Sequence, residues 1–78
     1  MKPAIYEALK TFDTRLHRVF PAATFRLIDP FEGYDMAVEV TLPVGKITWH
    51  DRMQLAEITA ALEEEYDVYI GLLTRTAA

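Results

Sequence analysis

Large apolar residues alternate with small or polar ones between Met36 and Leu42, and this alternation is the clearest structural signal in the chain. Apolar side chains occupy every second position, while Ala37, Glu39 and a threonine occupy the positions between them. Because a β-strand repeats every two residues, the pattern predicts a strand over residues 34–42 with one buried face and one face that tolerates water.

Two other segments have the period of a helix. Apolar residues recur at steps of three and four over residues 3–20, where Pro3 suits the first helical position and Pro21 ends the helix. Thr48, followed three residues later by Asp51, forms a capping-box pattern that predicts the start of a second helix. We expect this helix to present one broad apolar face made of Leu55, Ile58, Leu62, Tyr66, Met53, Ala56 and Ala60.

Two shorter apolar segments complete the predicted sheet. Residues 23–28 read as a strand, and the acid, proline and glycine of residues 29–33 predict a turn into an antiparallel hairpin. Residues 67–74 read as a third strand that is apolar on both faces, with Tyr69 and Leu73 on the side away from the core. We expect the tail, residues 75–78, to fray.

The resulting prediction is a single α+β domain over residues 1–78 with the order helix, strand, strand, helix, strand. Both helices should cover one face of a three-stranded mixed sheet. The third strand is expected either parallel beside the second or antiparallel beside the first.

Composition narrows the possible functions. The chain has 78 residues, no cysteine, no serine and two histidines, which excludes disulfides, thiolate metal sites and a serine or cysteine nucleophile. We therefore expect no metal and no cofactor, and self-association is the remaining way for so small a core to gain burial. No apolar run approaches the roughly 20 residues of a membrane span and no leader is apparent, so we expect a cytoplasmic location.

Charge is distributed unevenly along the chain. The first 26 residues hold five basic and two acidic side chains, whereas residues 27–67 hold ten acidic and two basic ones. Because the predicted strands carry acids that would repel a phosphate backbone, we do not expect nucleic-acid binding. The basic face of the first helix is expected to pair with nearby acids or with the acidic half of a second copy.

Two acidic residues, Asp35 and Glu39, lie on the alternating strand with Ala37 between them. Together with the order of the elements, Asp35 resembles the first acid of the magnesium-binding pair in minimal nucleotidyltransferase domains. Ala37 stands where that family has its second acid, and residues 27–31 replace its Gly-Ser loop. The resemblance implies a catalytically degenerate relative.

The leading functional hypothesis is a non-enzymatic interaction module that forms a homodimer through Trp49, Tyr69 and Leu73. The alternative partner is another protein, whose basic groove would bind the acidic surface of this chain. The competing hypothesis is an enzyme-like or ligand-binding domain whose open sheet face uses Asp35, Glu39 and His50 as polar anchors. His50 stands beside Asp51 at a helix start, a pairing that acid–base chemistry can use, but we expect Asp51 to cap the helix and His50 to be a solvated surface residue.

Overall fold

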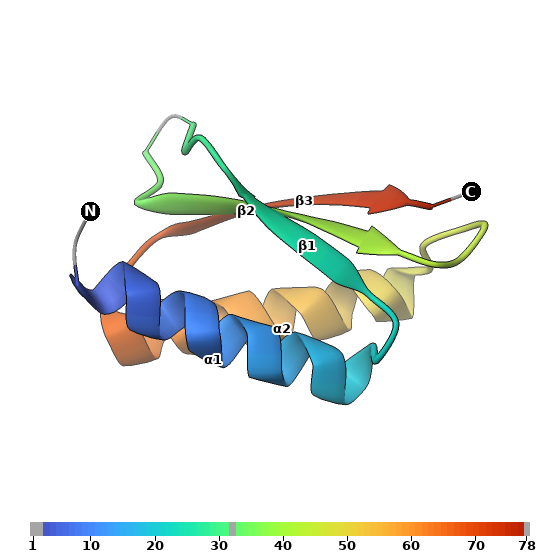
Figure 1. Ribbon diagram of the computed structural model, residues 1–78, viewed down its shortest axis with the longest axis horizontal. Helices are drawn as coiled ribbons and strands as arrows, with labels where there is room; N and C mark the ends of the chain where they lie inside the picture. Colours follow the sequence, from blue (N-terminus) through green and yellow to red (C-terminus); the bar gives the residue numbers. More distant parts are fainter. Residues whose placement is uncertain (1–2, 32, 78) are drawn as a thin grey trace.

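Two helices lie side by side on one face of a three-stranded sheet (Figure 1). This computed structural model describes residues 3–31 and 33–77. The elements follow one another along the chain as α1 (Pro3–Val19), β1 (Thr24–Ile28), β2 (Met36–Leu42), α2 (Trp49–Tyr66) and β3 (Ile70–Thr76). The predicted α+β class, element order and placement of both helices are confirmed.

The sheet has the strand order β1-β2-β3. β1 runs antiparallel to β2, and β3 runs parallel to it, so that Val38 lies between Leu27 of β1 and Leu72 of β3. Of the two sheet orders that the sequence allowed, the structure therefore has the one in which the third strand is parallel beside the second. β2 is the central strand, which explains why its alternation is the strongest pattern in the chain.

The predicted core face of β2 is confirmed. Its four alternating apolar side chains are at most 2% exposed and point toward the helices. Burial of each such side chain contributes about 1.5–3 kcal/mol, so this layer supplies much of the stability of the domain. The largest fully buried side chains are Phe12, Leu16, Met36, Leu42, Leu55, Leu62, Val38 and Val40.

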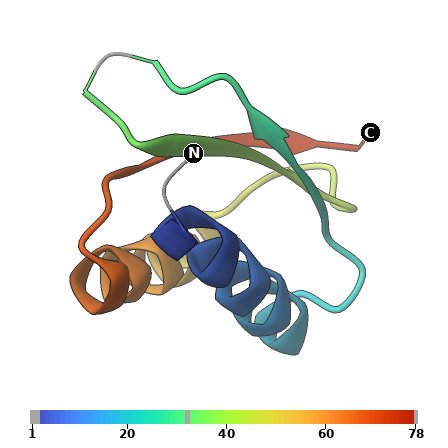
Figure 2. The same cartoon turned by 60° about the vertical axis from the view of Figure 1, so that its left-hand side comes forward.

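The opposite face of β2 is less open than predicted. Ala37 points away from the helices but is fully buried. A Cβ added to its neighbour Gly71 would lie 2.8 Å from the ring of Phe31, and Phe31 packs edge-on against Tyr34 at 5.0 Å. Both rings belong to the β1–β2 connection, which arches over the side of the sheet that the helices leave uncovered (Figure 2). The prediction of a solvated face is therefore wrong at this end of the sheet.

The boundaries of β3 differ from the prediction of residues 67–74. α2 ends at Tyr66, its C-cap residue Asp67 is in the left-handed conformation (φ 52°), and two linking residues follow before β3 begins at Ile70. The other predicted elements shift by no more than two residues at either end. The prediction ran the strand directly on from the helix because left-handed helix ends usually use glycine or asparagine, and Asp67 is neither.

The end of β3 also corrects the expectation of a frayed tail for residues 75–77, whereas Ala78 lies outside the described residues. Arg75 and Thr76 belong to the strand, and Thr76 pairs with Leu42. The N–H of Ala77 donates to the carbonyl of Leu42 at 3.0 Å. Pairing with the full length of β2 orders these residues, a tertiary effect that local sequence does not carry.

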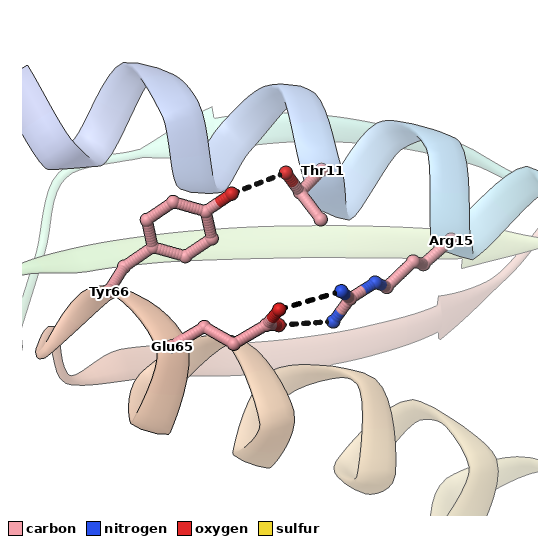
Figure 3. A network of polar contacts seen from close by, with 4 residues as sticks. All are labelled: Thr11, Arg15, Glu65 and Tyr66. Carbon is pink, nitrogen blue, oxygen red and sulfur yellow. Dashed lines mark hydrogen bonds and ion pairs between the residues drawn. The ribbon is translucent and has the colours of Figure 1, made fainter.

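Two polar contacts connect the helices, as Figure 3 shows. The guanidinium of Arg15 donates to both carboxylate oxygens of Glu65, at 2.5 and 3.0 Å, and the hydroxyls of Thr11 and Tyr66 lie 2.8 Å apart. The hydrogen bond from Arg15 holds the pKa of Glu65 below its ordinary value. The basic face of α1 thus pairs with a nearby acid at Arg15, and the two contacts fix α1 against α2.

His17 connects the end of α1 to the chain that leads into β1. Its Nδ1 lies 2.9 Å from the backbone carbonyl oxygen of Asp13 and 2.8 Å from the side-chain carboxylate of the same residue. Its Nε2 lies 2.8 Å from the carbonyl oxygen of Ala23. Both ring nitrogens face acceptors, so only the imidazolium can donate to both. Hydrogen bonds, first to the carbonyl of Asp13 and then to that of Ala23, raise the pKa of His17.

Candidate interaction surface

The residues singled out in the sequence fall into two groups. One group lies on or beside the sheet, and the other begins α2 in the helix layer. The structure therefore does not gather the polar anchors of the ligand-binding hypothesis into one pocket, since His50 belongs to the helix layer and Glu39 to the outer sheet face. The sheet group is Asp35, Glu39, Tyr69 and Leu73, and the helix group is Trp49 and His50.

Asp35 ties the start of β2 to the start of β3. Its N–H donates to the carbonyl of Tyr69 at 2.8 Å, and its carboxylate accepts the N–H of Tyr69, also at 2.8 Å. Asp35 precedes β2 instead of lying within it, as the predicted strand had it. The reciprocal backbone contact gives this carboxylate a structural task that the sequence did not indicate.

Glu39 forms ion pairs across the outer face of the sheet. Its carboxylate lies 2.9 Å from Nε of Arg26 on β1 and 3.8 Å from Nη1 of Arg75 on β3. The side chain of Glu39 is only 18% exposed, so it is less open to solvent than the alternation suggests. Within residues 3–31 and 33–77, no group of three or more carboxylates and histidines is arranged to hold a metal ion.

The predicted capping box at the start of α2 is confirmed. The hydroxyl of Thr48 accepts the N–H of Asp51 at 3.1 Å, and the carboxylate of Asp51 accepts the N–H of Thr48 at 3.0 Å. The bond from the Thr48 N–H is the main reason that the pKa of Asp51 is lowered. Asp51 therefore caps the helix, and the cap sets Trp49 and His50 as its first two residues.

A row of apolar side chains on α2 faces solvent. Trp49, Met53, Ala56 and Ala60 follow one another at steps of four, three and four, which places them on one side of the helix. All four are exposed, with Trp49 at 74%. The prediction that Met53, Ala56 and Ala60 belong to the buried face is wrong, because α2 meets the core only through the row that contains Leu55. We call these four residues the α2 stripe.

Contacts on either side of the α2 stripe locate it in the fold. Arg52 donates to the hydroxyl of Thr74, and Glu63 accepts the N–H of Ile70 at 2.9 Å, so this side of α2 adjoins β3. Glu65 faces the other way, toward α1. The α2 stripe therefore lies on the flank of the molecule that β3 borders, away from α1.

Comparison with known proteins adds no relative: no protein-family model, curated protein or solved structure matches this chain. Neither helix in the described part of the chain is long and apolar enough to span a membrane.

Proposed function

We propose that this chain is a small non-enzymatic protein-interaction module that acts as a homodimer. The observation that carries the proposal is the α2 stripe, an apolar row that the monomer leaves in water. Trp49, its largest member, is 74% exposed. Tryptophan and methionine are enriched in protein interfaces, and contiguous exposed apolar surface marks interaction sites.

The small size of the domain gives self-association a thermodynamic reason. A chain of this length buries only about 60% of the surface of its unfolded form, and this one has no disulfide to compensate. Tyr69 and Leu73 add further apolar surface next to the same flank, at 67% and 44% exposure. Contact with a second copy would bury these apolar side chains, which a single copy leaves exposed.

The molar mass in solution tests the proposal. Light scattering behind a sizing column, run from low to high micromolar concentration, should approach twice the 8.9 kDa of one chain. Trp49→Lys should shift the molecule toward the monomer. Tyr6→Lys is the matched control, because Tyr6 is also an exposed aromatic residue, at 58%, but lies on α1. A mass of one chain at every concentration would overturn the proposal.

A further inference from the structure

β3 is the last strand of the sheet and has an open edge. Tyr69 exchanges hydrogen bonds with Asp35 at the start of β2, so the backbone groups of alternate residues from Tyr69 onward face β2. The intervening residues turn their N–H and carbonyl groups outward, as the contact between the Ile70 N–H and Glu63 shows. By this alternation Leu72, Thr74 and Thr76 present backbone groups on a side where the described chain supplies no further strand.

The edge of β3 lacks the features that usually prevent strands from pairing between molecules. Natural edges are blunted by prolines, lysines, bulges or short length. β3 has seven residues, an unbroken register with β2, and neither proline nor lysine. Its charged side chain, Arg75, points across the outer face toward Glu39. Glu63 accepts the N–H of Ile70 at the first residue of β3. The strand residues after Ile70 leave outward-facing N–H and carbonyl groups with which an extended chain can pair.

The open edge and the α2 stripe form one continuous flank. Arg52 and Glu63 reach from α2 to β3, and the stripe lies one step farther around the helix. The strand spans about 23 Å and the stripe about 18 Å by their rises per residue. A typical stable interface removes roughly 800 Å² per partner, about a sixth of the 5054 Å² surface of this chain.

We propose, building on the homodimer proposed above, that a second copy docks on this flank about a two-fold axis. The β3 strands of the two copies pair antiparallel, which joins two three-stranded sheets into one of six, and the two α2 helices pack against each other below. A two-fold interface uses the same patch on both partners, so the patch must be complementary to itself. A strand edge meets this condition because two copies of it can pair antiparallel. The apolar row on the helix must meet it as well.

The order of side chains along the α2 stripe meets that condition. Antiparallel packing about the middle of the stripe places Trp49 opposite the partner's Ala60 and Met53 opposite the partner's Ala56. Each large side chain thus faces a small one, which lets the two helices approach closely. Charge follows the same order, since Asp51 and Arg52 balance each other near the start of α2, whereas Glu63 and Glu64 make its end acidic. The antiparallel arrangement brings the positive end of each helix toward the negative end of its partner.

Disulfide trapping tests this arrangement without background, because the chain has no cysteine. In a two-fold antiparallel pair, the distance between the two copies of one residue grows by about 7 Å for each step away from the axis. A disulfide needs its two Cα atoms within about 4.4–6.8 Å. Single cysteines placed in turn from residue 72 to residue 75 should therefore cross-link at one or two adjacent positions near the middle of β3, and poorly at the others.

Tyr6→Cys on α1 is the matched exposed control, and light scattering of each reduced variant reports the dimer separately. Trapping that peaks near Leu73 and Thr74 and is at least tenfold weaker at Tyr6 would support strand pairing. A dimer that shows no trapping along β3, or equal trapping at Tyr6, would overturn strand pairing and leave the proposed homodimer standing. A monomer at all concentrations would overturn both.

Discussion

The capping box at the start of α2 provides a sharp test of how this fold is stabilised. Thr48→Ala removes the hydroxyl that accepts the Asp51 N–H at 3.1 Å and leaves that donor to water. Substitutions of this kind cost about 1 kcal/mol, within a range of roughly 0.5–2. Against a total of roughly 4–12 kcal/mol for a domain of this size, the loss is large. It corresponds to a fall in melting temperature of about 4–8 °C.

Thermal and urea unfolding followed by circular dichroism would measure this effect. All variants must be compared at one protein concentration, because self-association stabilises the folded state by mass action. Thr48→Ser keeps the hydroxyl and should stay close to the parent, while His50→Ala should change the free energy of unfolding by less than about 0.5 kcal/mol, as surface substitutions do. A loss at His50 equal to or larger than the loss at Thr48 would refute the assignment of the cap.

The reciprocal half of the capping box depends on pH. The pKa of Asp51 is lowered in the folded state, chiefly by the Thr48 N–H. The carboxylate therefore contributes stability above its unfolded pKa of about 4, and this contribution is lost as the pH falls through the lower folded value. The stability difference between the parent and Asp51→Ala should accordingly be present at neutral pH and shrink in acid. A difference that stays constant down to pH 2 would contradict this account.

Three further predictions follow from other parts of the molecule. Leu62→Ala should cost about 2–5 kcal/mol in urea unfolding because its side chain is fully buried, whereas exposed Lys10→Ala should cost less than about 0.5. The pKa of His17 is raised on folding, so its contribution to stability is complete below the unfolded pKa near 6.5 and is lost as the pH rises through the folded pKa. The free energy of unfolding of the parent should therefore exceed that of His17→Ala by more at pH 5.5 than at pH 9. An equal margin at both pH values would argue against an imidazolium bridge. Isothermal titration with ATP and magnesium should show no binding below millimolar concentrations, since the Asp35 carboxylate accepts the N–H of Tyr69 just before β3. Saturable binding that Asp35→Ala removes would favour the nucleotidyltransferase resemblance.

The features that the sequence predicted well are those encoded locally. The alternation around Val38 predicted the central strand and its core face, and Thr48 with Asp51 predicted the start of α2. In both cases neighbouring residues carry the whole signal, because strand period and helix capping depend on spacings of two and three. The two possible sheet orders could not be separated in this way, since pairing of β2 with β3 depends on contacts between distant residues.

The surface was harder to predict than the core. Met53 and Ala60 have apolar side chains at helical spacing, and spacing alone cannot tell a row that meets the core from one that faces away from it. Ala37 presents the opposite case: the pattern placed it in water, but it is fully buried beside Gly71, its partner on β3, against which the rings of Phe31 and Tyr34 pack. Trp49, Tyr69 and Leu73 are exposed, but only the structure shows that α2 and β3 border the same flank.

Trp49 is the single tryptophan of the chain, and its place on the α2 stripe makes it an intrinsic optical reporter. An indole that is already 74% exposed in the folded monomer should emit almost as it does in the unfolded chain, so fluorescence would scarcely register unfolding of an isolated copy. Association through the stripe would move the ring into an apolar setting and shift its emission to the blue. Dissociation on dilution at constant temperature would then appear as a red shift of the Trp49 emission. The emission wavelength of this one residue would therefore report assembly separately from folding.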